Sequence, residues 1–179
     1  GVGKVLFISS DKAVAAANAY GSSKAMAEWV ATGFNTYSVP RGTRIATLRY
    51  GNVAYSRGSV LWAWEAAAQA QKPLSLTACG MTRFWLDLGQ ACDLVDRSLA
   101  LISGGEIFVP ELPAVSMDDL AEACGGATLG IRIVGLRPGG EKMHEWLLSE
   151  EELGRTHRVA ERLLQIRPHT MTWSCDMAQ

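Results

Sequence analysis

Short apolar segments with the β-branched composition of buried strands alternate along the chain with segments whose apolar residues recur at helical spacing. This alternation predicts an α/β fold with a mostly parallel sheet. The spacing predicts helices over residues 19–34, 59–71, 88–102 and 116–124. It predicts strands over residues 5–9, 44–50, 74–77, 106–110 and 131–136, and a last strand within residues 161–168.

The charge balance excludes several classes of partner. A formal net charge of −1 gives no electrostatic reason to bind nucleic acid or an anionic membrane surface. No apolar run is long enough to span a bilayer, and we expect a cytoplasmic protein. We expect no metal site, because the histidines and cysteines lack metal-ligand spacing; the cysteines are Cys79, Cys92, Cys124 and Cys175.

Polar side chains follow two of the predicted strands at the point where each strand ends. Ser9, Ser10, Asp11 and Lys12 close the first strand, and Asn52 follows the second. Ligands of open parallel sheets bind at the carboxyl ends of the strands. We therefore expect a functional site at this edge of the sheet.

Tyr20 and Lys24 are four residues apart and share one face of the predicted helix. An ammonium beside a phenol favours the phenolate, which can take a proton from an alcohol while a hydride leaves its carbon. The alternative is a half-exposed tyrosine and a solvated lysine. The position of the pair, at a helix start after a buried strand, favours catalysis.

Asp11 and Lys12 place an acid and an amine side by side at a strand end. Such a pair can serve as proton donor and proton acceptor. The alternative is a surface ion pair, which contributes little to stability. An enzyme that only oxidises an alcohol has no use for the pair, whereas an enzyme that also removes water from its substrate needs it.

Five segments resemble the polysaccharide-biosynthesis branch of the extended short-chain dehydrogenases, and within it the C5-inverting sugar-nucleotide 4,6-dehydratases. They run in family order over most of the chain: SSDKAVAAANAYGSSK, LRYGNVAYSRGSV, MTRFWLDL, GGEIFVPELPAVSMDDLA and GLRPGGEKMHEWL. The resemblance implies an NAD- or NADP-dependent lyase that converts a UDP-N-acetylhexosamine into a 4-keto-6-deoxy sugar nucleotide, as at the start of pseudaminic acid synthesis.

The resemblance also implies catalytic roles. Tyr20, assisted by Lys24, takes the C4 hydroxyl proton while hydride goes to the nicotinamide. Lys12 then removes the C5 proton, and Asp11 protonates the departing C6 hydroxyl. The residues expected at the cofactor are Ser9, Tyr20, Lys24 and Val53.

Further segments are expected to hold the sugar nucleotide. Arg83 and Arg137 suit a diphosphate, because a guanidinium makes paired hydrogen bonds to phosphate oxygens. Either arginine is alternatively a solvated charge, and the Arg83 motif alternatively orders the fold. Trp62 and Trp64 are expected in the core. The full set of predicted substrate-binding residues is Ser10, Asn52, Arg57, Gly58, Ser59, Val60, Arg83, Arg137 and Glu141.

The family begins with a Gly-rich cofactor-binding segment that this sequence lacks. We therefore expect a fragment with an incomplete Rossmann-like, doubly wound sheet, inactive alone and homo-oligomeric when complete. Residues 1–75 are predicted to form half of the Rossmann-like domain, and residues 76–179 a smaller substrate-binding region interleaved with it. The alternatives are a UDP-sugar 4-epimerase, which does not need Asp11 and Lys12, and a non-catalytic sugar-nucleotide-binding remnant.

Overall fold

The computed structural model describes residues 1–169, so Cys175 lies outside the described residues. The chain forms two compact units. The first unit contains residues 1–50, 92–111 and the stretch from residue 146, and the second contains residues 51–91 and 112–145. The predicted boundary at residue 75 falls inside the second unit. No helix within residues 1–169 has the length and apolarity needed to cross a membrane.

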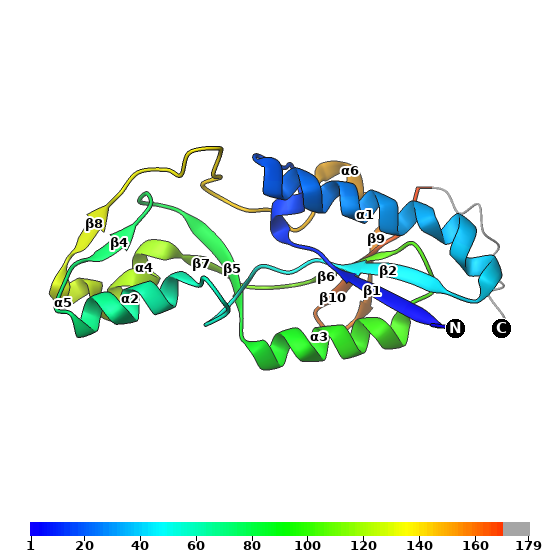
Figure 1. Ribbon diagram of the computed structural model, residues 1–179, viewed down its shortest axis with the longest axis horizontal. Coiled ribbons are helices and arrows are strands. Elements are labelled where there is room, and N and C mark those ends of the chain that lie inside the picture. The colour runs from blue at the N-terminus through cyan, green and yellow to red at the C-terminus, as the bar shows by residue number, and fades with distance from the viewer. Residues whose placement is uncertain (170–179) are drawn as a thin grey trace. The chain divides into compact units, whose positions relative to one another are not determined.

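The first unit is built on a five-stranded sheet with the strand order β1-β2-β6-β10-β9 (Figure 1). The strands β1 (Lys4–Ile8), β2 (Arg44–Leu48) and β6 (Ile107–Pro110) are parallel. The strands β10 (Leu163–Ile166) and β9 (Thr156–Ala160) complete the sheet in antiparallel pairing. All four residues of β6 are buried, as expected of a central strand.

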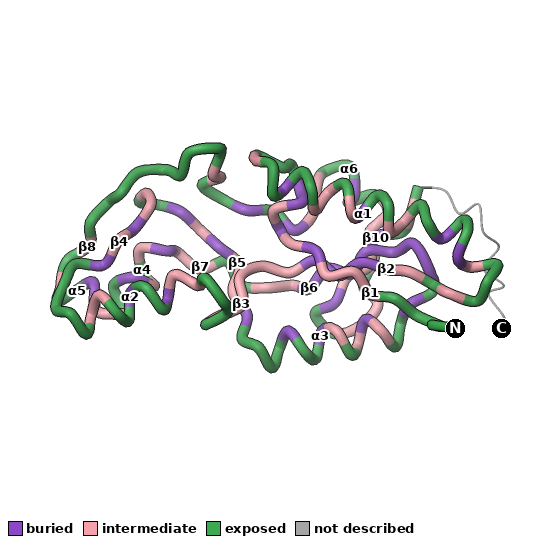
Figure 2. Tube along the Cα trace, in the orientation of Figure 1, coloured by how far each residue is buried: buried purple, intermediate pink, exposed green. Residues whose placement is uncertain are grey.

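Two helices lie on opposite faces of this sheet (Figure 1). The helix α1 (Ala19–Ser38) is capped by Asn18, whose side chain accepts a hydrogen bond from the Gly21 backbone N–H. The helix α3 (Leu88–Leu101) enters the first unit at Cys92. In Figure 2 the exposed positions of α1 recur along its outer side, as an amphipathic helix requires.

The second unit holds two small sheets and a helical layer. The strand β5 (Thr82–Leu86) pairs with β3 (Asn52–Val53) and β7 (Ala114–Ser116), and β4 (Leu74–Leu76) pairs with β8 (Ile131–Ile133). The helical elements are α2 (Val60–Gln69), α4 (Met117–Ala121), a π-helical turn (Glu122–Gly126) and α5 (Ala127–Leu129). Their core contains Leu61, Trp64, Leu74, Leu76, Met81, Met117 and Ala121.

The α/β fold with mostly parallel sheets is confirmed, and every strand and helix expected from the spacing is present. The helix α4 begins at Met117 and is capped by Ser116, whose hydroxyl accepts from the Asp119 N–H as expected of an N-cap. Trp64 is buried as predicted, but Trp62 is 52% exposed, so that part of the prediction is wrong. The sequence reasoning did not anticipate β3, β5, β7, β9 or the short helix α6 (Glu150–Leu153).

Candidate functional site

The loop after β1 holds a buried carboxylate. It forms a 3-10 turn over Asp11–Ala13 that Ser10 caps. The Ser10 hydroxyl donates to Asp11 Oδ1 at 2.7 Å, and Lys12 Nζ donates to the same oxygen at 3.1 Å. The Asp11 side chain has no exposed surface, whereas the Lys12 side chain is 29% exposed. Within residues 1–169, Asp11 Oδ2 and the buried Ser9 Oγ have no hydrogen-bond partner.

The first turns of α1 carry Tyr20 and Lys24 beside that loop. Lys24 Nζ donates to the carbonyl oxygen of Ile8 at 3.1 Å and lies 6.0 Å from the centre of the Tyr20 ring. A side chain at Gly21 would overlap the carbonyl oxygen of Lys12, so only glycine permits this approach of helix and loop. The first unit therefore brings together six predicted site residues, namely Ser9, Ser10, Asp11, Lys12, Tyr20 and Lys24.

Tyr50 is a neighbour of this cluster that the sequence reasoning missed. Its carbonyl oxygen accepts the backbone N–H of Asp11 at 3.1 Å. Burial raises the pKa of the Tyr50 phenol, and the charges of Cys92 and Tyr20, when ionised, raise it further. The position directly after β2 was the available signal, because polar residues at that strand end were already expected in the site.

A buried ion network connects α1 with α6, and the sequence did not predict it. Arg49, which follows β2, pairs with Glu28 of α1 at 2.6 Å and with Glu152 of α6 at 2.8 Å. Burial disfavours the charged form of Arg49, but the hydrogen bonds to both carboxylates outweigh it and raise its pKa. Burial likewise opposes the charge of Glu152, but Arg49 and the N–H of Ser149 hold the pKa of that carboxyl below its usual range. This network borders a cavity of about 460 Å³.

Apart from Ser10, which lies in the first unit, the residues expected to bind the sugar nucleotide belong to the second unit. Asn52 and Val53 form β3 and pair with Trp85 and Leu86 of β5. The following loop exposes Arg57 and turns at Gly58, whose φ of 81° favours glycine. Ser59 then caps α2, which begins at Val60. These residues therefore form one continuous segment from a strand end to a helix start.

Arg83, Arg137 and Glu141 form a second group in this unit. Arg83 is buried and donates from Nη1 to the carbonyl oxygens of Thr82 and Met143, and from Nη2 to Glu141 at 3.3 Å. The Arg137 side chain is 76% exposed, and its Nε lies 3.9 Å from Glu141. Arg83 thus orders the loop around Glu141, whereas the guanidinium of Arg137 is open to a ligand.

A parallel sheet whose first strand ends in a polar loop, beside a helix that begins with Tyr-x-x-x-Lys, defines the extended short-chain dehydrogenase class of protein. Within that class, the chain belongs to the polysaccharide biosynthesis protein family, whose sequence profile matches residues 1–167. The family resemblance expected from the sequence is confirmed.

The chain is similar to curated relatives of two activities. It is 36% identical over 158 residues to the UDP-N-acetylglucosamine 4,6-dehydratase (inverting) of Campylobacter jejuni, and this match covers 88% of this chain and 47% of the relative. It is 39% identical over 157 residues to the UDP-glucose 4-epimerase of Rickettsia bellii, and this match covers 86% of this chain and 46% of the relative. The chain spans about half the length of the curated relatives it matches.

Solved structures show the same fold. The X-ray structure of Pen from Bacillus thuringiensis superposes with a TM-score of 0.86 and 32% identity, over 93% of this chain and 53% of that protein. A dTDP-glucose 4,6-dehydratase from Streptomyces venezuelae, with NAD and TYD bound, superposes with a TM-score of 0.70 and 21% identity, over 89% and 56% of the two chains. At that identity the likeness shows the fold alone.

Proposed function

We propose that the protein containing this chain is a sugar-nucleotide 4,6-dehydratase that acts on a UDP-N-acetylhexosamine and inverts C5. The observation that carries the proposal is the pair of Asp11 and Lys12 beside the helix that bears Tyr20 and Lys24. A C4 oxidation needs only the tyrosine and its lysine. The additional acid and amine are the groups that the elimination of water requires.

The first unit has groups that suit a nicotinamide dinucleotide, NAD or NADP. Ser9 Oγ is buried without a hydrogen-bond partner among the described residues, and Tyr20 is 53% exposed, beside an anchored Lys24. A buried hydroxyl without a partner is costly, and a ligand group that bonds to it removes that cost. When bound, the nicotinamide supplies the hydride acceptor and later the hydride donor. Val53 stays a predicted contact.

The side chains divide the proton transfers between them. The ammonium of Lys24 stabilises Tyr20 as the phenolate, which takes the proton of the C4 hydroxyl and becomes the neutral phenol. The 4-keto group then acidifies the C5 proton, which the neutral amine of Lys12 removes after its ammonium proton has passed to Asp11 across their hydrogen bond. Asp11 gives a proton to the departing C6 hydroxyl, which leaves as water, and Ser10 orients Asp11 through the bond to Oδ1. The buried Oδ2 of Asp11 must become accessible for this step.

The second unit is proposed to hold the nucleotide part of the substrate. Arg137 is the arginine best placed to bind the diphosphate, because its guanidinium is exposed while that of Arg83 bonds protein carbonyls. Glu141 is proposed to accept from ribose hydroxyls. The segment from Asn52 to Val60 is proposed to bind the sugar nucleotide.

Product analysis of the full-length protein tests the proposal. Incubation with UDP-N-acetylglucosamine and NADP⁺ is expected to give a 4-keto-6-deoxy product, with deuterium from heavy water at C5. The similarity to the Rickettsia bellii relative favours a second candidate, a UDP-sugar 4-epimerase. A C4 epimer that retains its C6 hydroxyl and its C5 proton would establish that activity in place of the dehydratase.

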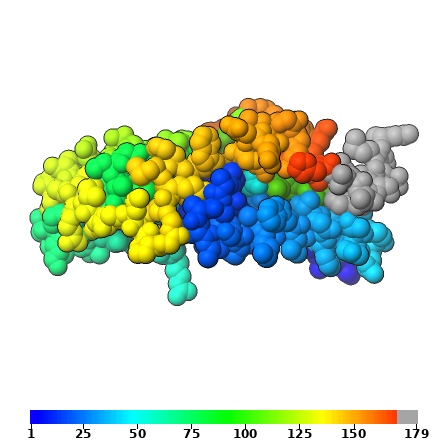
Figure 3. All heavy atoms as spheres, turned by 90° about the horizontal axis from the view of Figure 1, so that it is seen from above, coloured from blue at the N-terminus to red at the C-terminus, as the bar shows by residue number. Residues whose placement is uncertain are grey.

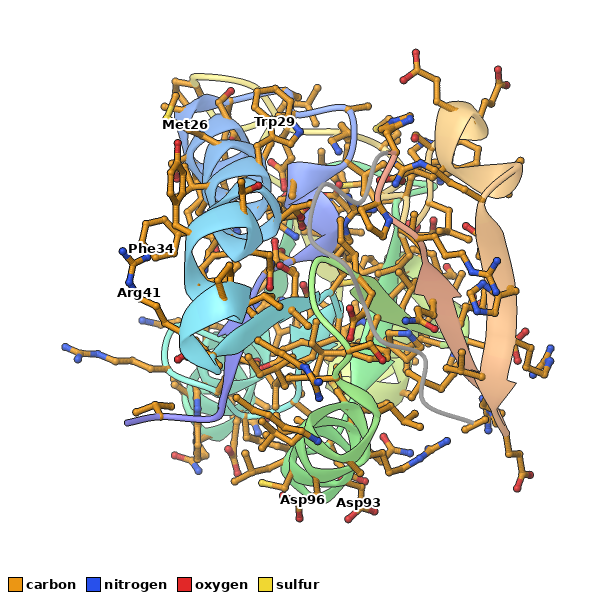
Figure 4. All side chains as sticks on the ribbon, turned by 90° about the vertical axis from the view of Figure 1, so that its right-hand side faces the viewer. Met26, Trp29, Phe34, Arg41, Asp93 and Asp96 are labelled. Carbon is orange, nitrogen blue, oxygen red and sulfur yellow. The ribbon has the colours of Figure 1, made fainter. Side chains whose placement is uncertain are left out.

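We also propose that the complete protein is a homo-oligomer. The outer side of α1 exposes four large apolar side chains: Met26, Val30, Phe34 and Tyr37. Figure 4 shows two of the four, Met26 and Phe34, projecting from the helix. The outward side of residues 29–38 carries no charged residue, and apolar surfaces of this kind mark contacts between proteins.

A further inference from the structure

Arg49 holds two elements of the first unit at once. Its Nε and Nη2 donate to the two oxygens of Glu28 at 2.9 and 2.6 Å, and its Nη1 and Nη2 donate to those of Glu152 at 2.9 and 2.8 Å. Nη1 also donates to the carbonyl oxygen of Leu147 at 3.1 Å. The three charged side chains are at most 9% exposed. A guanidinium with both edges in bidentate pairs has one orientation available to it.

Glu28 connects this network to the catalytic face of α1. It lies four residues after Lys24 and eight after Tyr20, so the three side chains occupy one face of the helix. Pinning Glu28 sets the rotation of α1 about its axis. The hydrogen bond from Lys24 Nζ to Ile8 depends on the same rotation.

The residue after Arg49 fixes the other half of the site. The carbonyl oxygen of Tyr50 accepts the N–H of Asp11 at 3.1 Å, which anchors the loop of Asp11 and Lys12. One dipeptide therefore holds the polar loop through its backbone and the catalytic helix through a side chain. The backbone of the dipeptide is itself anchored, because the Arg49 N–H donates to the carbonyl oxygen of Phe108 in β6.

We propose that Arg49 is a positioning residue of the reaction, which acts through Glu28 to hold Tyr20 and Lys24 against the loop of Asp11 and Lys12. This inference rests on the proposed function. Stability alone does not explain a guanidinium buried between two carboxylates, because apolar side chains of similar volume often stabilise a core as well or better. A fixed helix rotation is what the ion network adds.

The two carboxylates give a matched pair of variants for the test. Both Glu28→Gln and Glu152→Gln remove one charge from the network, but only Glu28 belongs to α1. Figure 3 shows α1 in blue and the segment around α6 in orange on the same face of the first unit. Both variants are expected to lower the melting temperature of the full-length protein by similar amounts. A purely structural network predicts similar effects on catalysis as well.

Positioning predicts different effects on catalysis. Glu28→Gln is expected to lower kcat for the 4-keto-6-deoxy product by about 10- to 100-fold, the range for a misplaced catalytic group. The KM for the sugar nucleotide is expected to change by less than about 3-fold, and Glu152→Gln to keep kcat within about 3-fold. Amide hydrogen exchange, followed by mass spectrometry, is expected to accelerate over residues 19–28 in Glu28→Gln only.

The outcomes distinguish a positioning role of the ion network from a purely structural one. Equal losses of kcat in the two variants, or full kcat with unchanged exchange in Glu28→Gln, would overturn the positioning role. If Glu28→Gln does not fold, Glu28→Asp keeps the charge with a shorter side chain, and the same split from Glu152→Gln is expected. If the wild-type protein dehydrates no UDP-sugar, the proposed function fails, and the exchange data alone still decide whether Arg49 orders α1 through Glu28.

Discussion

Lys24 Nζ donates a hydrogen bond to the carbonyl oxygen of Ile8 at 3.1 Å, and this bond ties the start of α1 to the last residue of β1. The same ammonium lies 6.0 Å from the centre of the Tyr20 ring. Lys24 thus has two functions, one as an anchor between helix and strand and one as the charge beside the proposed base. The following substitutions are designed for the full-length protein.

Tyr20→Phe removes the proposed base while it preserves the ring. Because no other step can begin before C4 is oxidised, we expect the loss of both the 4-keto product and C5 deuterium exchange. The measurement is mass spectrometry of the sugar nucleotide after incubation in heavy water. Retention of C5 exchange in this variant would mean that Tyr20 is not the group that starts the reaction.

Lys12→Ala removes the proposed C5 base. We expect turnover and C5 exchange to fall together by about 10²- to 10⁴-fold, the usual effect of losing one acid–base group. Asp11→Asn is the companion variant. It is expected to lose turnover and to keep C5 exchange, because Lys12 is still present. Unchanged turnover in Lys12→Ala would reduce the pair to a structural contact and favour the epimerase.

Glu152 makes the free energy of unfolding depend on pH. Its pKa in the folded protein is lowered, so its carboxylate contributes stability above the pKa of the unfolded chain, about 4.3, and that contribution is lost as the pH falls through the folded value. Urea denaturation at a series of pH values is expected to show that the free energy of unfolding falls less steeply with decreasing pH in Glu152→Gln than in the wild type. Asp96→Asn is the control, because Asp96 points to solvent on α3 (Figure 4). If the free energy of unfolding of Glu152→Gln falls with pH as steeply as that of the wild type, Glu152 is not a source of the pH dependence.

Gly21→Ala tests the close approach of α1 to the polar loop. Its Cβ would overlap the carbonyl oxygen of Lys12, so we expect a destabilisation of about 1–3 kcal/mol and a loss of activity. Gly33→Ala is the matched control in the same helix, where an added Cβ meets nothing within 4 Å. There the higher helix propensity of alanine is expected to stabilise the protein by about 0.5–1 kcal/mol. Denaturant titration of both variants distinguishes the two effects.

Phe34→Lys tests the apolar side of α1. A charge within an apolar interface is expected to shift a homo-oligomer towards smaller species in sedimentation velocity. Asp93→Lys changes the charge on α3 and is expected to leave the distribution unchanged (Figure 4). An unchanged distribution in Phe34→Lys as well would place any subunit contact elsewhere.

The sequence was sufficient for the elements whose apolar residues are continuous or helically spaced. Val5 to Ile8 and the residues of β6 have the composition of buried strands, and α1 has an amphipathic pattern. β5 was missed because its second residue is the charged Arg83, which leaves an apolar run of only three residues. β9 was missed for the same reason, since Arg158 and His157 interrupt it.

The site was predicted in part, because motif spacing identifies residues but not their partners. Tyr20, Lys24, Asp11 and Lys12 follow from local spacing around one strand end. Arg49 could not be assigned, because its partners lie 21 and 103 residues away in the chain. Trp62 was placed in the core on composition, whereas it borders Tyr55 in an edge-to-face contact at 4.9 Å on the surface.

The insertion of β10 beside β6 has a consequence for biosynthesis. β6 ends at Pro110, but its second neighbour in the sheet begins at Leu163, after the whole remainder of the second unit has been made. During synthesis on the ribosome, one edge of the strand β6 therefore has no partner strand while about fifty further residues are translated, which takes several seconds at ordinary rates. An open apolar edge attracts other strands, so the emerging chain is at its most vulnerable to aggregation before its own C-terminal residues close the sheet.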